Sequence, residues 1–243
     1  MQEILLIDKP KGITSFDCIR ILRKKLGIRK MGHAGTLDPM ATGLMIIGVG
    51  EGTKRLQEFL KLDKTYEAEI LLGVQTDTGD ITGKILKEVG IKSSELSEEK
   101  IRKTLQGMVG KLELPVPAYS AIKRGGEALY KKARRGEVVD APIKIMEIQS
   151  AEFLGVGILP LEKGVPTSSA GRDFLPSISK EGTEGWLVSA RFSVTSGTYI
   201  RSLAEELGRR LGVQATLAAL RRTRIGEFKI EDAQQLYIHA TKD

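Results

Sequence analysis

The residues of this sequence that could do chemistry concentrate in one short segment, residues 32–43, which reads GHAGTLDPMATG. Three glycines and one proline among twelve residues predict an ordered loop without helical structure. Pro39 biases the residue before it toward an extended backbone, which would project the Asp38 carboxylate away from the local chain. An ordinary Asp-Pro turn within a glycine-rich connection explains the same pattern. Composition leaves both interpretations open.

Residues 45–53 (MIIGVGEGT) contain a rival motif, an apolar strand followed by G-x-G-x-G and a helix. Such loops bind a dinucleotide or the cofactor of a methyltransferase, because glycines let backbone N–H groups approach the ligand. They require a parallel βαβ unit in which an acidic residue closes the next strand about 20 residues later. Glu67 and Glu69 lie near that distance, but they begin an alternating strand that leads into a hairpin. The missing parallel context disfavours this motif.

The rare residues exclude several classes of function. The chain of 243 residues has one cysteine, Cys18, and two histidines, His33 and His239, without the spacing of a zinc site. Zinc-dependent deamination of a nucleobase is therefore excluded, and we expect no metal and no other cofactor. An internal disulfide is impossible, and no apolar run approaches the roughly 18 to 20 residues of a membrane span. Residues 1–10 do not resemble a signal peptide, so we expect a cytoplasmic protein that is not bound to a membrane.

The net charge of +7 is unevenly distributed along the chain. Residues 20–30, 123–135 and 191–224 hold 19 of the 38 lysines and arginines against three acidic residues. Basic stretches on an otherwise acidic chain indicate a surface that binds a polyanion. The alternative is charge that only solvates helix surfaces.

Hydrophobic spacing predicts the elements that must position these residues. Thr14 or Ser15 is the expected cap of a first helix, and Asp17 favours its first turn. The expected helices are 15–27, with Phe16, Ile19, Leu22 and Leu26 on its apolar face, 53–62, one that starts at Ser97, and 198–211; the expected strands include 4–7 and 44–49.

A further strand is expected from Lys64, with alternate residues from Tyr66 to Val74 on one face. Residues 77–80 predict a turn, after which 83–86 return as the antiparallel partner. Because strands here lead to hairpins more often than to crossover helices, we predict an α+β fold with a mixed, mainly antiparallel central sheet and flanking helices and loops. Residues 155–185, of which 13 of 31 are Gly, Pro or Ser, predict a mobile insertion within a strand pair.

Several sequence blocks, taken in order, resemble a known enzyme family. They are DKPKG at 8–12, GHAGTLDPMATG at 32–43, KTY at 64–66 with LGVQTDTGD at 72–80, PVPAYSAIK at 115–123, SGTYIRSLAEELG at 196–208 and LRR at 220–222. Their combination is similar to the TruB family of bacterial tRNA pseudouridine-55 synthases, over residues 4–154 and 186–238. This resemblance implies the pseudouridine synthase fold and an enzyme that isomerises uridine to pseudouridine at position 55, in the T-loop of tRNA, after base flipping.

The resemblance also implies roles for three catalytic residues. Asp38 matches the nucleophile, which attacks either the sugar or the base. Tyr66 matches a tyrosine that packs against the base and takes part in proton removal at its C5, and Arg201 matches the arginine that pairs with the aspartate. Read without the resemblance, Tyr66 fits a core tyrosine better, and Arg201 also fits a surface pair with Glu205.

Further residues match the substrate and RNA site. His33 matches a histidine that fills the space left by the flipped nucleotide, and Lys9, Tyr199 and Leu220 match supporting positions. Since RNA loops are held through phosphates and splayed bases, segment 119–136 is the expected RNA clamp. Its expected RNA-binding residues are Lys123, Arg124, Lys131 and Lys132, with Arg221 and Arg222 completing the basic surface. The expected partner is the T-arm of tRNA, without an obligatory protein partner.

The sequence departs from the family's pattern in places. Val194, Thr195 and Ser196 stand where Cys-Ser-Lys is common, which removes one positive charge, and the insertion 155–185 is longer than the family's pattern. We expect residues 1–243 to form a single catalytic domain that lacks the full C-terminal RNA-binding domain of many members.

Overall fold

The computed structural model describes residues 3–91, 96–160 and 184–236. The chain divides into two compact units, which are described separately. Unit 1 comprises Met1–Glu67, Ser193–Ser196 and Leu220–Asp243, and unit 2 comprises Ala68–Phe192 and Gly197–Ala219. The chain passes between the units after Ser196 and within three strands: β4 (Lys64–Leu72), β11 (Glu184–Val194) and β12 (Ala215–Ile225).

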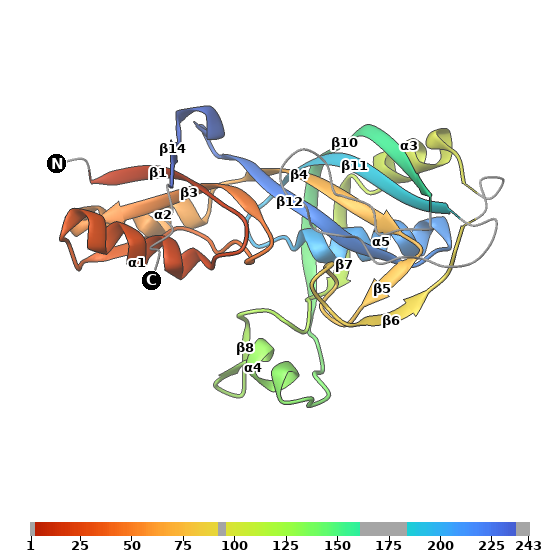
Figure 1. Cartoon of the computed structure of the whole chain (residues 1–243), viewed down its shortest axis with the longest axis horizontal. Coiled ribbons are helices and arrows are strands. Elements are labelled where there is room, and N and C mark those ends of the chain that lie inside the picture. Colours follow the sequence, from red (N-terminus) through yellow and green to blue (C-terminus); the bar gives the residue numbers. More distant parts are fainter. Residues whose placement is uncertain (1–2, 92–95, 161–183, 237–243) are drawn as a thin grey trace. The chain divides into compact units, whose positions relative to one another are not determined.

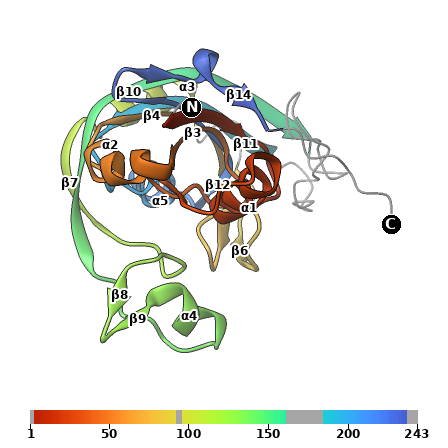
Figure 2. The ribbon, with the colours of Figure 1, turned by 90° about the vertical axis from the view of Figure 1, so that its left-hand side faces the viewer.

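Unit 1 is built on a mixed sheet, with helices α1 and α2 on the same side of strands β1 and β3 (Figures 1 and 2). Strand β3 pairs antiparallel with β1 and β2 and parallel with the end of β12, and β1 pairs parallel with β14. The elements are β1 (Ile4–Lys9), α1 (Ser15–Leu26), β2 (Met31–His33), β3 (Thr42–Val49), a 3-10 helix (Gly50–Arg55), α2 (Leu56–Leu60), β13 (Phe228–Lys229), a second 3-10 helix (Ile230–Asp232) and β14 (Gln234–Gln235).

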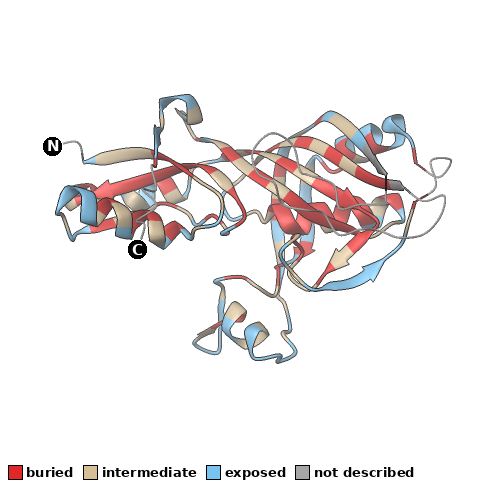
Figure 3. Ribbon diagram, in the orientation of Figure 1, coloured by how far each residue is buried: buried red, intermediate tan, exposed pale blue. Residues whose placement is uncertain are grey.

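The core of unit 1 lies between strand β3 and helix α2. Phe59 of α2 packs with Leu44 and Ile46 of β3 and with Ile225 of β12. The Phe59 ring meets the Phe228 ring edge to face at 5.5 Å between centroids. Every residue of β3 after Thr42 is buried, as Figure 3 shows along this strand. The strand that follows the Asp38 loop is therefore held on both faces.

Helix α1 begins where the sequence predicts. The Thr14 hydroxyl accepts a hydrogen bond from the Asp17 backbone, and the Asp17 carboxylate accepts one from the Thr14 backbone, which forms a capping box. The helix ends at Leu26, before Gly27 in a left-handed conformation. The predicted apolar face is partly wrong: Phe16 is 54% exposed and Leu26 is 41% exposed. The Arg23 guanidinium lies instead over the Phe16 ring, 5.7 Å from the ring centroid.

The G-x-G-x-G segment packs backbone against backbone. A Cβ on Gly52 would lie 2.1 Å from the Glu3 carbonyl oxygen, and one on Gly48 would lie 2.8 Å from the Gly52 carbonyl oxygen. The segment leads into the first 3-10 helix and then α2, so the helix predicted over 53–62 is two shorter pieces. Close packing accounts for these two glycines without a cofactor.

In unit 2 strand β10 pairs antiparallel with β7, and α3 packs against β10 and α5. Two small antiparallel pairs, β5 with β6 and β8 with β9, form separate sheets. The elements are β5 (Val74–Thr76), β6 (Ile85–Glu88), α3 (Glu98–Gln106), β7 (Gly110–Pro115), β8 (Lys123–Arg124), β9 (Glu127–Ala128), α4 (Leu129–Arg134), β10 (Ile143–Pro160) and α5 (Ile200–Leu211).

The strand expected from Lys64 shows the predicted alternation of buried and half-buried residues up to Ile70. It ends at Leu72, because Gly73 turns the chain with a φ of +93° and Val74 starts strand β5. The predicted hairpin is confirmed, but its return strand is Ile85–Glu88 and it pairs with β5. The predicted insertion is wrong over 155–160, which complete strand β10, and over 184–185, which begin β11. Residues 161–183 lie outside the described residues.

The described strands support the predicted fold class. Pairs β1–β3, β2–β3, β7–β10 and β12–β13 are antiparallel, whereas β1–β14 and β3–β12 are parallel. Helices and strands follow one another without a regular βαβ alternation. The prediction of an α+β fold with a mixed, mainly antiparallel sheet is confirmed.

Over the described ranges, no helix is both long and apolar enough to cross a membrane.

Candidate active site

Asp38 lies half-buried on the loop between β2 and β3 in unit 1. Leu37 and Met40 on either side of it are 3% and 5% exposed, so their side chains anchor the loop in the core. The Ala41 N–H donates to the Asp38 carbonyl at 3.0 Å and closes a tight turn. Buried neighbours and a closed turn leave the Asp38 backbone little freedom. The prediction of an ordered, non-helical loop is confirmed.

The start of helix α1 holds this loop from outside. The Ser15 hydroxyl donates to the Leu37 carbonyl at 3.0 Å and accepts from the Leu37 N–H at 2.8 Å. The Gly12 N–H donates to the Pro39 carbonyl at 2.8 Å. These bonds fix the residues directly before and after Asp38. Sequence reasoning considered Ser15 as a helix cap and missed this role, because its partner is a backbone group 22 positions away.

Lys9, at the end of β1, is fully buried and donates to three carbonyls. The acceptors are Pro10 at 2.9 Å, Ile13 at 2.8 Å and Pro39 at 3.3 Å. Burial lowers the pKa of Lys9 to about 8, and the Asp38 charge acts in the opposite direction. The Lys9 ammonium and the Asp38 carboxylate are therefore coupled electrostatically. Through Pro39, the Lys9 ammonium connects the end of β1 to the residue that follows Asp38.

His33 ends strand β2 and is half-buried. Burial and the neighbouring Arg222 charge lower the pKa of His33 below its ordinary value of 6.5, so the imidazole is neutral at pH 7. Within the described part of the chain its Nδ1 is buried without a hydrogen-bond partner. A neutral imidazole carries no charge that would need solvent, which suits contact with an uncharged nucleobase.

Strand β12 places Leu220, Arg221 and Arg222 side by side in unit 1. Leu220 is 9% exposed. Arg221 is partly exposed, and its guanidinium donates to both carboxylate oxygens of Asp8, at 2.7 and 3.2 Å. Its contact with RNA stays a prediction.

The Arg222 side chain is only 1% exposed and points into the protein. It donates to the carbonyls of Leu44 at 2.7 Å and Gly35 at 3.3 Å. This burial is at odds with the expected phosphate contact, because the guanidinium has almost no surface to offer a ligand.

Tyr66, on strand β4, lies on the buried face and is 9% exposed. Its position agrees with a core tyrosine, the interpretation that the isolated sequence favours. Packing of this ring against a nucleobase stays a prediction.

Arg201 occupies the first turn of α5 in unit 2 and is 5% exposed. Its guanidinium donates to the Thr78 carbonyl at 2.8 Å and to the Tyr119 carbonyl at 3.0 Å. The interpretation as an exposed surface pair with Glu205 is therefore wrong. Pairing of Arg201 with Asp38, which belongs to unit 1, stays a prediction.

The turn that carries Thr78 is itself fixed by Asp80. One Asp80 carboxylate oxygen accepts from the Thr78 hydroxyl at 3.0 Å and from the Thr82 N–H and hydroxyl at 3.0 and 2.6 Å. The other oxygen lies 3.9 Å from the Arg201 guanidinium. Sequence reasoning missed Thr78 and Tyr119 as partners of Arg201, because they contribute backbone carbonyls that any residue type supplies.

Tyr199 directly precedes α5 and is half-buried. Its N–H lies 3.5 Å from the Met146 sulfur, and the Lys144 ammonium lies 6.0 Å from its ring centroid. Lys144 also donates to the Gly197 carbonyl at 2.8 Å, which fixes the chain before the helix.

The expected RNA clamp folds as the β8–β9 pair and helix α4. Arg124 forms an ion pair with Asp140 at 2.6 Å, and Arg135 forms ion pairs with Glu127 and Glu137. In contrast, Lys123, Lys131 and Lys132 form no ion pair with any described residue. Lys123 and Lys131 are exposed and Lys132 is half-buried. These three lysines have the least competition for a phosphate.

Ser196, where the resemblance expects a lysine, donates to the Leu60 carbonyl at 2.5 Å. The Lys64 ammonium lies 3.5 Å from the Ser196 hydroxyl and donates to the Leu60 and Leu62 carbonyls. Burial lowers the pKa of Lys64 to about 8. The Lys64 ammonium, from strand β4, therefore lies beside Ser196, the position at which the family commonly has a lysine.

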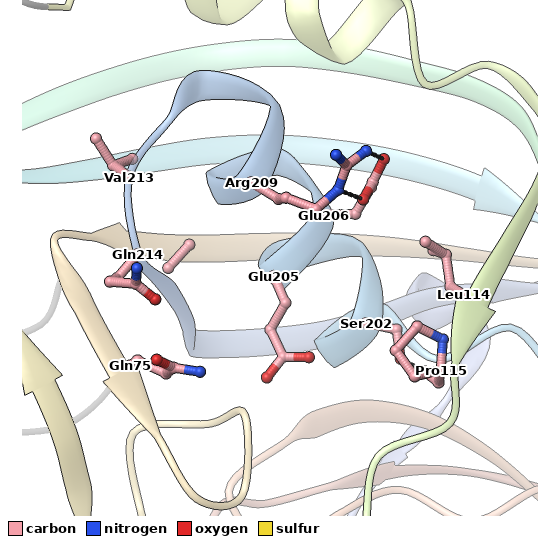
Figure 4. Close-up of a pocket in the computed structure, with 10 residues that line it drawn as sticks. Gln75, Leu114, Pro115, Ser202, Glu205, Glu206, Arg209, Val213 and Gln214 are labelled. Atoms are coloured by element: carbon pink, nitrogen blue, oxygen red, sulfur yellow. Dashed lines mark hydrogen bonds and ion pairs between the residues drawn. The ribbon is translucent and has the colours of Figure 1, made fainter. Parts of the chain in front are cut away.

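A pocket of about 310 Å³ adjoins α5 in unit 2, and the Glu205 side chain points into it (Figure 4). Burial raises the pKa of Glu205, and the nearby Arg201 charge opposes this effect. The next residue, Glu206, accepts hydrogen bonds from Arg209 and Arg210. Neither Arg201 nor Tyr199 lines this pocket. Across the described ranges, no cluster of three or more His, Cys, Asp or Glu residues could hold a metal ion.

Comparison with known proteins gives a consistent classification. Residues 23–161 match the model of the TruB family pseudouridylate synthase N-terminal domain, and residues 201–243 match that of the tRNA pseudouridylate synthase B C-terminal domain. The chain therefore belongs to the TruB family of pseudouridylate synthases.

Curated relatives named tRNA pseudouridine synthase B align over most of the chain. The protein from Xanthomonas oryzae pv. oryzae is 41% identical over 93% of this chain and 64% of its own length. The Thermotoga petrophila protein is 38% identical over 99% of this chain and 68% of its own length, and the Opitutus terrae protein is 40% identical over 96% and 85%. The chain thus spans slightly less than two thirds of the Xanthomonas relative.

Solved structures place the fold among the pseudouridine synthases, as predicted. A chain in the crystal structure of a Cbf5–Nop10–Gar1 complex is 26% identical, with a TM-score of 0.63 over 96% of this chain and 52% of its own. A chain in an H/ACA RNP bound to a substrate RNA that contains 2′-deoxyuridine has a TM-score of 0.61 at 24% identity, over 96% of this chain and 50% of its own. This second likeness concerns the fold alone.

The lowered pKa of Lys9 predicts an alkaline limit to activity. Above a pH of about 8 the Lys9 ammonium loses its proton, and with it the positive charge beside Asp38. The turnover rate should therefore fall above about pH 8, by up to about tenfold per pH unit. Between pH 8 and the ordinary lysine value of 10.5 the folded state binds fewer protons than the unfolded state, so Lys9 makes the protein more stable as pH rises. Unfolding caused by Lys9 would therefore not explain a fall in turnover above about pH 8.

Turnover measured from pH 6.5 to 9.5 checks this prediction. Lys9→Arg, which keeps its proton, should move the decline to higher pH. Lys64→Arg is the matched control, because Lys64 has a similarly lowered pKa, and it should leave the decline in place. An unchanged decline in Lys9→Arg would contradict the assignment.

Proposed function

We propose that this protein isomerises uridine to pseudouridine at position 55, in the T-loop of tRNA, with Asp38 as the nucleophile after base flipping. Membership of the TruB family and the names of the relatives support the reaction and the substrate. The observation that carries the assignment is the Asp38 loop. Its carboxylate is half-buried, and the backbone on both sides is held by Ser15, Gly12 and Lys9.

The reaction needs no redox partner and no transferred group. The N1–C1′ bond of uridine breaks, a C5–C1′ bond forms, the proton leaves C5, and N1 gains a proton. Substrate and product are isomers, so a positioned carboxylate nucleophile is sufficient to start the reaction, whether it attacks the sugar or the base. In this proposal Tyr66 packs against the base and takes part in removing the C5 proton, and Arg201 pairs with Asp38.

The target uracil lies inside a folded RNA loop and must leave its stack before a carboxylate can reach it. We assign the vacated space to His33, whose neutral imidazole suits contact with bases. Tyr199 and Leu220 line the substrate site in this proposal, and the lysines of segment 119–136 hold the phosphates of the T-arm. We further propose that residues 1–243 act as a single catalytic domain in the cytoplasm, without an obligatory protein partner.

Replacing the proposed nucleophile tests the chemistry directly. Asp38→Asn should reduce turnover by at least about 10⁴-fold, because an amide does not form the same covalent bond, and RNA affinity should stay within a few-fold. Unmodified tRNA is incubated with the protein without any cofactor, and pseudouridine is mapped by position. Near-normal product from Asp38→Asn would reject the role of Asp38. A wild-type protein that binds tRNA and leaves every uridine unchanged would instead favour a non-catalytic RNA chaperone.

Arg201 and Glu205, which lie one turn apart on α5, offer a matched pair of substitutions. Arg201→Ala should lower turnover by about 100-fold or more, because it removes the cation that we assign to Asp38. Glu205→Ala should change turnover little, since the Glu205 carboxylate points into the pocket of Figure 4 and makes no hydrogen bond within the described residues. Arg201→Lys separates charge from shape and should recover part of the rate. Equal, mild effects of the two alanine variants would contradict the role of Arg201.

The free lysines of the clamp predict a salt-dependent contribution to RNA affinity. Replacing Lys123, Lys131 and Lys132 together with alanine should weaken T-arm binding and lower the slope of log affinity against log salt by about 2, at roughly 0.7 to 0.9 per lost phosphate contact. The control replaces the exposed Lys87, Lys103 and Lys111, which removes the same charge from other elements of unit 2. An equal change of slope in both variants would show a general charge effect instead of a clamp.

A further inference from the structure

Arg222 is an arginine buried beneath the Asp38 loop, and its hydrogen bonds reach both ends of that loop. Its Nε donates to the Leu44 carbonyl at 2.7 Å, and its Nη2 donates to the Gly35 carbonyl at 3.3 Å. Gly35 precedes Asp38 by three residues, and Leu44 follows it by six. One rigid guanidinium therefore connects the Gly35 and Leu44 carbonyls, which lie on either side of Asp38 in the sequence.

The backbone geometry of β3 and β12 brings Arg222 this close. The strands pair in parallel with Arg222 opposite Gly43. Gly43 has a φ of +108°, and a Cβ at this position would lie 2.3 Å from the Arg222 carbonyl oxygen. Any larger residue at position 43 would force the strands apart here. The glycine that ends the GHAGTLDPMATG block thus permits the approach from which Arg222 reaches the loop.

Within the part of the chain that the structure describes, no ion pair neutralises the charge of Arg222. No carboxylate of the described residues lies within ion-pair distance of its guanidinium, which is bonded to backbone carbonyls. Burying such a cation costs free energy that carbonyl hydrogen bonds offset only in part. Its charge also lowers the pKa of Lys9, His33 and Lys64. Arg222 is thus electrostatically coupled to the groups around the candidate site.

The neighbouring arginines on the same strand differ in each respect. Arg221 is partly exposed and forms an ion pair with Asp8. Arg224 is exposed and, among the described residues, donates only to the nearby Gly226 carbonyl at 3.0 Å. The three arginines are the same residue type on one strand, but Arg221 and Arg224 contribute charge to the surface, whereas Arg222 makes its hydrogen bonds inside the protein.

We propose that Arg222 is a positioning residue that fixes the Asp38 loop in its reactive conformation and makes no contact with RNA. This inference rests on the proposed function. It replaces the sequence-based expectation that Arg222 binds phosphate. In the free protein Arg222 holds the carbonyls on both sides of Asp38, so that the carboxylate is already oriented when the flipped nucleotide arrives.

The test compares Arg222→Met and Arg222→Lys with Arg224→Met, each in the full chain. The measurements are the single-turnover rate at saturating T-arm RNA, the RNA dissociation constant at several salt concentrations, and the melting temperature. Arg222→Met should lose at least about 100-fold in rate, while the dissociation constant stays within about threefold and the salt slope is unchanged. Arg222→Lys, which keeps the charge and a donor, should recover part of the rate. Arg224→Met should keep the wild-type rate.

Different results overturn different statements. A wild-type rate in Arg222→Met would reject the inference, as would a weaker dissociation constant with a salt slope lower by about 1, the sign of a lost phosphate contact. If Arg222→Met does not fold, Arg222→Lys carries the test. A folded Arg222→Lys variant with reduced turnover and unchanged RNA affinity supports the positioning role. A folded Arg222→Lys variant with wild-type turnover would show that the two guanidinium hydrogen bonds, to Leu44 and Gly35, are not needed, and would reject that role. Failure of the wild-type protein to form pseudouridine would reject the proposed function itself.

Discussion

Hydrogen bonds from buried side chains to backbone carbonyls hold the Asp38 loop, and the candidate chemistry depends on them. Lys9 donates to the Pro39 carbonyl, Ser15 to that of Leu37, and Arg222 to those of Gly35 and Leu44. A loop rich in glycine loses much conformational entropy when it is ordered, so its order must come from outside. Strand β1, the first turn of α1 and strand β12 supply it. The loop that carries the Asp38 carboxylate is therefore already ordered before substrate binds.

The same arrangement recurs in unit 2 around Arg201. Its guanidinium is held by the carbonyls of Thr78 and Tyr119, and the Thr78 turn is fixed by the Asp80 carboxylate. Carbonyl acceptors orient a guanidinium without neutralising its charge. The Asp80 carboxylate also lies 3.9 Å from the Arg201 guanidinium, so carbonyls and a carboxylate together orient this cation. Arg201 and Arg222 thus share one feature, a buried guanidinium that is oriented by backbone carbonyls.

Burial and ion pairing separate into three groups the basic residues that a composition counts together. Lys123 and Lys131 are exposed and form no ion pair with a described residue, which suits binding to a polyanion. Lys9 and Arg222 are buried, and the pKa of Lys9 is lowered to about 8. Arg124 and Arg135 form a third, intermediate group, because each is exposed and already paired with a carboxylate. A count of basic residues therefore overestimates the surface that is free to bind RNA.

The sequence by itself determined the family, the α+β class, the cap of α1 at Thr14, the alternating strand from Lys64, and Asp38 as the residue to examine. These features depend on local order: residue spacing, turn residues and blocks that occur in a fixed succession. The tertiary structure decided which basic residues face inward, why Gly43 must be a glycine, and that Phe16 lies outside the core. It also decided that the partners of Ser15, Arg201 and Arg222 are carbonyls distant in sequence. Every residue carries a carbonyl, so no residue type marks which one will accept, and only the folding of distant strands brings donor and acceptor together.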